Sequence, residues 1–203
     1  MYDPDQTPPP IPISPGRPAL PDPVREKLDF AVEEGLMVED IRMVRANYYG
    51  KISFVDHWCG EILKTFADRS WLDDLFVVFW SDHGEMAGDH GRLYKSTFYE
   101  SSIRVPLILR WPGKILAGGV SQALVEIIDV MQTILEAAGA GPSGRCLGRS
   151  LWPVTDNPAL EHRSSVLSEI WYGGSRNIMI RDRRYKYAID ERGLGFIDRK
   201  SVV

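Results

Sequence analysis

The sequence predicts an α/β fold in which a layered domain is followed by a small antiparallel sheet. Two apolar runs typical of buried strands, 75–80 and 105–111, lie between segments with the periodicity of amphipathic helices. Beyond residue 154 the pattern changes to short strand-like segments separated by turn residues. These observations together indicate a helix–strand–loop–strand–helix unit followed by a meander.

A long helix is predicted before the first strand, starting at Asp40 as the N-cap and ending near residues 67–70. Apolar residues recur there at steps of three and four, which places them on one face. They are Ile41, Val44, Tyr48, Ile52, Val55, Cys59, Ile62 and Phe66.

The two apolar runs carry β-branched and aromatic residues without polar alternation. Strands of this kind are covered on both faces, so we expect a largely parallel or mixed sheet. A second amphipathic helix is predicted over residues 123–138, with Gly139 as its C-terminal stop. Three further strands are expected within 164–172, 176–182 and 185–191.

The composition is that of an ordinary globular protein of 203 residues, with 44% hydrophobic and 26% charged residues. The net charge of −4 and the scattered Lys and Arg residues argue against a nucleic-acid-binding surface. Cys59 and Cys146 are too few for a disulfide framework and are not spaced as a zinc site. No apolar run is long enough to cross a bilayer, and neither compartment nor oligomeric state can be assigned.

A polar loop, WSDHGEMAGDHG at residues 80–91, follows the first predicted strand. Ligands of open α/β sheets bind beyond the carboxyl ends of the strands, which is where Asp82 and His83 lie. A neighbouring carboxylate and imidazole can both bind a divalent cation, and Gly84 allows the chain to turn. The same three residues are also compatible with an exposed polar turn.

The wider segment SDHGEMAGDHGRLYKSTFYESSIRVPLILRWPG, residues 81–113, closely resembles the sulfatase family of the alkaline phosphatase superfamily. It contains in order Ser-Asp-His-Gly, Gly-Asp-His-Gly, a lysine, Arg-Val-Pro-Leu and Trp-Pro-Gly. NYYGKISFVDHWCGEIL upstream and LGRSLWPV downstream are also similar to family segments. The resemblance runs from about residue 2 to about residue 189 and implies part of an alkaline-phosphatase-like layered domain.

The resemblance implies roles for three residues. Asp82 and His83 match two ligands of the active-site cation, usually Ca²⁺, and Lys95 matches the lysine that binds a sulfate oxygen. Cleavage of an anionic sulfate ester moves negative charge onto the leaving oxygen, which an ammonium group and a dication can stabilise.

The other polar residues are expected to have structural roles or none. His90 is expected to support the loop, and Glu85 and Asp89 to be solvated or to hold its shape. No chemistry is expected from a remaining set on the helix surface, in a polar turn and beside the second strand: His57, His162, Arg104 and Arg110.

The family's nucleophile is a formylglycine made from Cys or Ser within Cys/Ser-x-Pro/Ala-x-Arg, and neither cysteine of this chain fits that pattern. The acidic pair that completes the family's cation site and its earlier Lys and His residues are also absent. We therefore expect a fragment that is inactive alone and exposes one sheet edge and part of the long helix's apolar face.

The expected organisation has four parts. Residues 1–39 form a proline-rich crossing segment, since nine of the fourteen prolines lie in the first 23 positions. Residues 40–150 form part of the sulfatase α/β catalytic domain, and 151–197 begin an antiparallel C-terminal subdomain. Residues 198–203 are a possible non-native tail, because DRKSVV reads like a translated sequencing adapter.

The predicted function is hydrolysis of a small-molecule or saccharide sulfate ester, with no nucleic-acid or membrane partner. A phosphonate monoester hydrolase or phosphodiesterase of the same superfamily is the first alternative. A two-zinc member is disfavoured because the chain has only four histidines. Two further alternatives are a non-catalytic relative and a binding module that uses residues 1–23 as a ligand.

Overall fold

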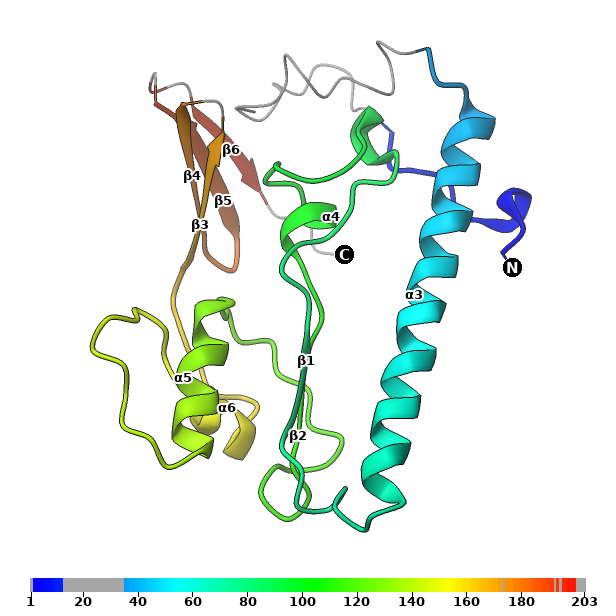
Figure 1. Ribbon diagram of the computed structural model, residues 1–203. Coiled ribbons are helices and arrows are strands. Elements are labelled where there is room, and N and C mark those ends of the chain that lie inside the picture. The colour runs from blue at the N-terminus through cyan, green and yellow to red at the C-terminus, as the bar shows by residue number, and fades with distance from the viewer. Residues whose placement is uncertain (1, 13–34, 173, 192, 194, 200–203) are drawn as a thin grey trace.

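A computed structural model describes residues 2–12, 35–172, 174–191, 193 and 195–199. Figure 1 shows helix α3 along one side, a pair of strands in the middle, and a sheet above two short helices on the other side. The predicted α/β class and the small antiparallel C-terminal sheet are confirmed. The described elements in chain order are η1 (Pro4–Gln6), α3 (Val38–Ala67), β1 (Val77–Trp80), η2 (Asp89–Gly91), α4 (Glu100–Ile103), β2 (Leu107–Arg110), α5 (Ile128–Ala137), α6 (Trp152–Asp156), β3 (Val166–Tyr172), β4 (Ser175–Arg181), β5 (Tyr185–Asp190) and β6 (Gly195–Arg199).

Helix α3 confirms the predicted long helix, but its start differs from the prediction. Met37 is the N-cap, and Asp40 lies three residues inside the helix. Its carboxylate accepts a hydrogen bond from the Met37 backbone nitrogen at 2.8 Å. Asp40 therefore stabilises the first turn from the position of a capping-box partner, where an acidic side chain also favours the helix dipole.

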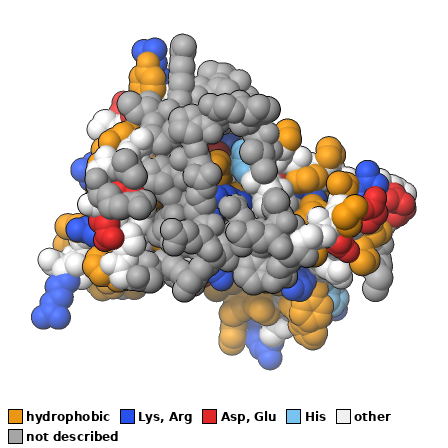
Figure 2. All heavy atoms as spheres, turned by 90° about the horizontal axis from the view of Figure 1, so that it is seen from above, with side chains coloured by type: hydrophobic (Ala, Val, Ile, Leu, Met, Phe, Trp, Pro, Cys, Tyr) orange, Lys and Arg blue, Asp and Glu red, His pale blue; other side chains and the backbone are white. Residues whose placement is uncertain are grey.

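The apolar face of α3 is largely exposed. Ile41 at its N-terminal end is buried, whereas Ile52, Val55 and Ile62 are 50%, 52% and 57% exposed. Among the described elements only η1 makes extensive contact with this helix, and Figure 1 shows its lower half standing apart. Hydrophobic side chains also lie among charged ones on the face seen in Figure 2. The expected exposure of part of this face is confirmed.

Strands β1 and β2 pair antiparallel, with Val77 opposite Arg110 and Trp80 opposite Leu107. The expected sheet was largely parallel or mixed, and the part of it that the described residues contain is this one antiparallel pair. Residues 81–106 leave β1 and return to the same end of the pair, and no crossover helix carries the chain to the opposite end. The strands are also less covered than expected, since Ile108 is 58% exposed.

Four strands form the C-terminal sheet in the order β3-β4-β5-β6, with antiparallel neighbours. The three predicted strands are confirmed. The fourth, β6, was not predicted, and it includes residues 198 and 199 of the expected tail. Phe98, just before α4, packs with Met179 and Ala188 of the sheet in a small buried core. The sheet is thus joined directly to the loop between β1 and β2.

Helix α5 begins at Ile128, five residues later than predicted, and Gly139 follows it with φ 68°. The Asp129 carboxylate accepts a hydrogen bond from the Glu126 backbone nitrogen at 2.9 Å, which holds the preceding segment in a turn instead of a helix. The predicted stop at Gly139 is confirmed, because glycine adopts the left-handed conformation readily.

The described part of the proline-rich segment lies against α3. Tyr2 Oη and Ser53 Oγ are 2.9 Å apart, and Arg42 pairs with Asp5 at 3.2 Å. Residues 13–34 of the expected crossing lie outside the described residues, and the expected domain boundaries stay predictions. Within the described ranges, no helix is long and apolar enough to cross a membrane.

Candidate active-site loop

Asp82 and His83 follow β1 directly, and their side chains are 82% and 41% exposed. His83 Nε2 lies 3.6 Å from Asp82 Oδ2. His83 Nδ1 lies 2.9 Å from the Gly84 carbonyl oxygen, which only accepts hydrogen bonds. This contact favours the tautomer in which Nδ1 is the donor, which would leave Nε2 of the neutral ring able to bind a cation.

This pair supplies two donors for a cation but not a complete site. Ca²⁺ takes six to eight oxygen ligands. The described residues contain no group of three or more His, Cys, Asp or Glu side chains that could hold a metal ion. The described residues therefore do not by themselves fit a bound cation.

Lys95 lies on the return arm of the same loop and is exposed. Asp82, His83 and Lys95 line one open cleft of about 2170 Å³, which continues between β2, the segment before α5 and the β3–β4 face. The structure thus brings the three predicted site residues to one cleft. An ammonium group, and a carboxylate–imidazole pair if it held a cation, would both attract an anionic ligand to this cleft.

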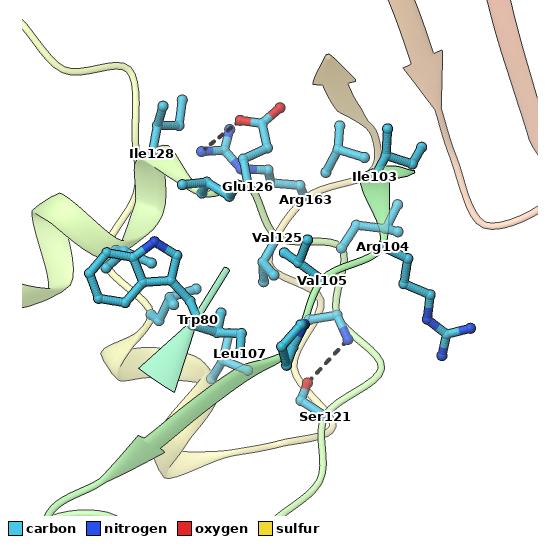
Figure 3. A pocket seen from close by; sticks show the side chains of 18 of the residues that line it. Trp80, Ile103, Arg104, Val105, Leu107, Ser121, Val125, Glu126, Ile128 and Arg163 are labelled. Atoms are coloured by element: carbon cyan, nitrogen blue, oxygen red, sulfur yellow. Dashed lines mark hydrogen bonds and ion pairs between the residues drawn. The ribbon is translucent and has the colours of Figure 1, made fainter. Parts of the chain in front are cut away.

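The deeper part of this cleft is apolar. Figure 3 shows Trp80 and Leu107 of the two strands around the same space as Val125 and Ile128. Trp80 is 43% exposed and lines the cleft. The cleft therefore has both charged and apolar lining residues, but its volume is larger than the roughly 300–1,000 Å³ of a typical small-molecule site.

Gly84 is required by close packing. A Cβ atom there would lie 2.0 Å from the Ser101 carbonyl oxygen, and the Gly84 nitrogen donates to the Ser102 carbonyl at 2.7 Å. The backbone of α4 thus fills the space beside Gly84. The sequence suggested that Gly84 allows a turn. The structure adds a second reason for glycine, which is the close approach of the protein's own backbone.

The loop holds four non-glycine residues in the left-handed region. Ala87, His90, Tyr94 and Ser96 have φ values of 43°, 56°, 66° and 71°. Such conformations cost roughly 1–3 kcal/mol each and persist only where surrounding contacts enforce them. Tyr94 and Ser96 are the neighbours of Lys95, so the conformation at the lysine depends on those contacts.

Asp89 is buried at the centre of this loop. Of the two expectations for it, solvation or holding the shape of the loop, the structure agrees with the second. Asp89 accepts hydrogen bonds from the Ile11 backbone nitrogen at 2.9 Å, from Ser101 Oγ at 2.5 Å and from Arg45 Nη1 at 3.1 Å. One carboxylate therefore joins the N-terminal segment, α3, α4 and the loop. Its buried charge is compensated by Arg45 and by hydrogen bonds.

The histidines divide into supporting and surface groups. The His90 ring stacks on Tyr99 with centroids 4.1 Å apart, in agreement with a supporting role. His57 is exposed on α3 beside Trp58, as expected. The expectation that His162 has no role is wrong. Its side chain is only 5% exposed, and Nε2 lies 3.2 Å from Asp129 Oδ2.

Asp129 forms a second buried centre, below the cleft. It is fully buried and accepts hydrogen bonds from Arg163 and from the Arg149 backbone nitrogen. Burial acts to raise the pKa of Asp129, but the hydrogen bonds from Arg163, Arg149 and Glu126 and the Arg163 charge outweigh it and lower the pKa. Figure 3 shows Arg163 paired with Glu126 at the border of the cleft.

A third group ties the loop to the C-terminal sheet. Glu100 accepts from Arg181 Nη1 at 2.8 Å and from Lys186 Nζ at 3.1 Å. Burial acts to raise the pKa of Glu100, but the charges and hydrogen bonds of Lys186 and Arg181 lower it overall.

Sequence reasoning did not find these two groups. Asp129 and Arg163 are 34 positions apart, and Glu100 and Arg181 are 81 apart. No local spacing in the sequence links the partners of such pairs. The only signal available was Lys186, a charged residue inside a predicted strand, which could have indicated a buried ion pair. Arg110, from which no chemistry was expected, donates from Nη1 to the Leu72 carbonyl at 2.9 Å.

Comparison with known proteins gives one family. Arylsulfatase K of Danio rerio is 33% identical over 77% of this chain and 31% of its own length. The multifunctional alkaline phosphatase superfamily protein PehA of Trinickia caryophylli is 35% identical over 73% of this chain and 32% of its own. The chain thus spans about a third of the length of these curated relatives.

A solved structure shows the same fold. The phosphonate monoester hydrolase SpPMH from Silicibacter pomeroyi superposes with a TM-score of 0.82 at 26% identity, over 98% of this chain and 45% of that one. The sulfatase family matches residues 16–140, more than half of the chain and the whole of the loop with Asp82, His83 and Lys95. On this match and the fold that accompanies it, the chain belongs to the sulfatase family.

Proposed function

We propose that this chain carries the part of a sulfuric ester hydrolase that binds the cation and the sulfate group. The observation that supports the proposal is the position of Asp82, His83 and Lys95 on one cleft. An adjacent carboxylate and imidazole beside an ammonium group suit an anionic ester, whose charge shifts during cleavage.

Each residue has a separate role in this proposal. Lys95 binds a sulfate oxygen through its ammonium group. Asp82 and His83 are two ligands of a divalent cation, which we propose is Ca²⁺, and the proposal requires further ligands besides those found among the described residues. Members of this family generally depend on a divalent cation and a formylglycine. The cation supplies Lewis-acid stabilisation when bound.

The nucleophile is also proposed to lie outside these residues, because no Cys or Ser here fits the formylglycine pattern. The proposed substrate is a small-molecule or saccharide sulfate ester. The apolar wall around Trp80 and Leu107 favours an ester whose alcohol part has an apolar or aromatic surface.

The test uses the longest open reading frame that encodes the chain, assayed with an aryl sulfate. Asp82→Ala and Lys95→Ala are each expected to lower kcat/KM by about 100-fold or more, the scale of removing one charge-stabilising group. Lys114→Ala, at an exposed lysine, is the control and is expected to match the parent. Unchanged turnover in the Lys95 variant would refute the proposed role.

A second test uses the 203-residue chain alone, which is expected to be inactive toward the same ester. Turnover by this chain would show that a nucleophile is present within it. Loss of its activity on mutation of a residue outside the loop would then locate that nucleophile.

Phosphonate monoester hydrolysis is the second candidate, because the solved structure with TM-score 0.82 is a phosphonate monoester hydrolase. Sulfate and phosphonate monoesters both carry one negative charge and can share the same alcohol leaving group, but they differ in the central atom and in the carbon substituent on phosphorus. The ratio of kcat/KM for an aryl sulfate to that for an aryl phosphonate separates the two. A ratio above about 10, equal to 1.4 kcal/mol of differential transition-state binding, favours the sulfatase.

A further inference from the structure

Two arms of the active-site loop run side by side, and Lys95 lies on the second. Near the tip, the arms are joined by hydrogen bonds from the Met86 nitrogen to the Tyr94 carbonyl and from the Gly88 nitrogen to the Arg92 carbonyl, both 2.7 Å. These bonds close the loop, and the first of them binds the Tyr94 carbonyl but not its backbone nitrogen.

Glu85 supplies the additional contact. Its Oε1 accepts from the Tyr94 backbone nitrogen at 2.5 Å and from the Ala87 backbone nitrogen at 3.1 Å. Both donors belong to residues with positive φ, one on each arm. A single carboxylate oxygen thus stabilises the strained backbone on both sides of the loop.

The connection to the site is short. Glu85 lies two residues after His83, and Tyr94 directly precedes Lys95. On the other side of the lysine, Thr97 is 3% exposed, with its hydroxyl on Met86 Sδ at 3.5 Å. Only Lys95 and Ser96 lie between the two anchored residues, Tyr94 and Thr97, and Glu85 provides the anchor at Tyr94.

We propose that Glu85 is the positioning residue that fixes the backbone at Lys95, in the cleft that Asp82 and His83 also line. It acts through the Tyr94 backbone and does not touch the substrate. What Lys95 binds rests on the proposed function, but the positioning itself does not. The required property is a hydrogen-bond acceptor at Oε1, so glutamine can replace glutamate and alanine cannot.

The first test measures amide hydrogen exchange in the 203-residue chain. Glu85→Ala is expected to speed exchange at Tyr94 by about tenfold or more, because a hydrogen bond to a charged acceptor is lost. Glu85→Gln is expected to stay within about threefold of the parent. Glu61→Ala, at an exposed glutamate of α3, is the matched control.

Exchange at Met179 and Ala188, in the buried core, reports on the whole fold. Faster exchange at Tyr94 with an unchanged core supports the proposal. Unchanged exchange at Tyr94 in Glu85→Ala overturns it. Equal acceleration at the core also overturns it, because Glu85 would then support the entire structure.

The second test is a double-mutant cycle in the longest reading frame, with an aryl sulfate. Glu85→Ala is expected to lower kcat/KM about tenfold when Lys95 is present and less than about twofold in a Lys95→Ala background. Equal losses in the two backgrounds overturn the proposal. If no ester is hydrolysed at all, the proposed function fails, and the exchange at Tyr94 still decides the positioning role.

Discussion

Lys186 of strand β5 donates a hydrogen bond of 2.8 Å from its ammonium group to the carbonyl oxygen of Phe98, 88 residues earlier in the chain. Phe98 lies three residues after Lys95 on the loop that carries the candidate site. The same ammonium group pairs with Glu100. The C-terminal sheet therefore fixes the end of the loop that follows Lys95. Loss of the sheet would release this end of the loop.

Lys186→Met is expected to lower the free energy of unfolding by about 2 kcal/mol. The change leaves the Phe98 carbonyl without its donor and removes one of two cations from Glu100, which is partly exposed. Urea unfolding measures the effect. Lys114→Met, at an exposed lysine, is the control, and an equal loss in both variants would show that the buried contacts are not the cause.

Acid is expected to destabilise the chain through Glu100 and Asp129. Both pKa values are lower in the folded state than their ordinary values of 4.5 and 3.8. The unfolded chain therefore binds more protons in this range, so the stability from these groups is complete above the ordinary values and is lost as pH falls through the lowered ones.

Unfolding curves between about pH 2.5 and 7 test this linkage. Glu100→Gln is expected to make the acid loss shallower, because one titrating group is removed. Glu161→Gln, at an exposed position, is the control. An identical pH dependence in the Glu100 variant would contradict the assignment.

Arg163→Met is expected to destabilise the chain by about 3–5 kcal/mol, because Asp129 is fully buried and would lose its ion-pair partner. Asp129→Asn in the same background should recover part of the loss, since an amide tolerates burial without a cation. Arg176→Met breaks an exposed pair with Glu169 and is expected to have no measurable effect. Similar losses of unfolding free energy in the two arginine variants would contradict the expected difference between the buried and the exposed ion pair.

Gly84→Ala is expected to cost about 2 kcal/mol or more, because its Cβ would lie 2.0 Å from the Ser101 carbonyl oxygen and force α4 away. Gly50→Ala is the opposite case. Gly50 lies inside α3 with open space around it, so alanine is expected to stabilise the helix by about 0.5–1 kcal/mol. Thermal unfolding of the two variants compares them, and a neutral Gly84→Ala would contradict the close approach.

The exposed apolar side chains of α3 are expected to make the 203-residue chain associate. Trp58 and Ile62 are 52% and 57% exposed, one helical turn apart. Sedimentation over a range of concentrations measures the association, and Trp58→Lys with Ile62→Lys should reduce it. A monomer at all concentrations, with a sharp thermal transition, would contradict this expectation.

Local patterns were sufficient for the elements but not for their pairing. The periodicity from Ile41 to Phe66 predicts α3, and the apolar runs predict β1 and β2. The pairing of β1 with β2 depends on the path of residues 81–106, which strand composition does not encode. Strand β6 was missed because its short, glycine-flanked segment has no clear alternation and is specified by its partner β5.

The sequence by itself determined the family and pointed to Asp82, His83 and Lys95, because these residues lie in a contiguous motif. Their chemical roles stay predictions. Only the tertiary structure decided what holds them in place, namely Glu85 on the Tyr94 amide and Lys186 on the Phe98 carbonyl. The physical reason is that a side chain can be recognised by its type and spacing, whereas a contact between distant segments exists only after the chain has folded.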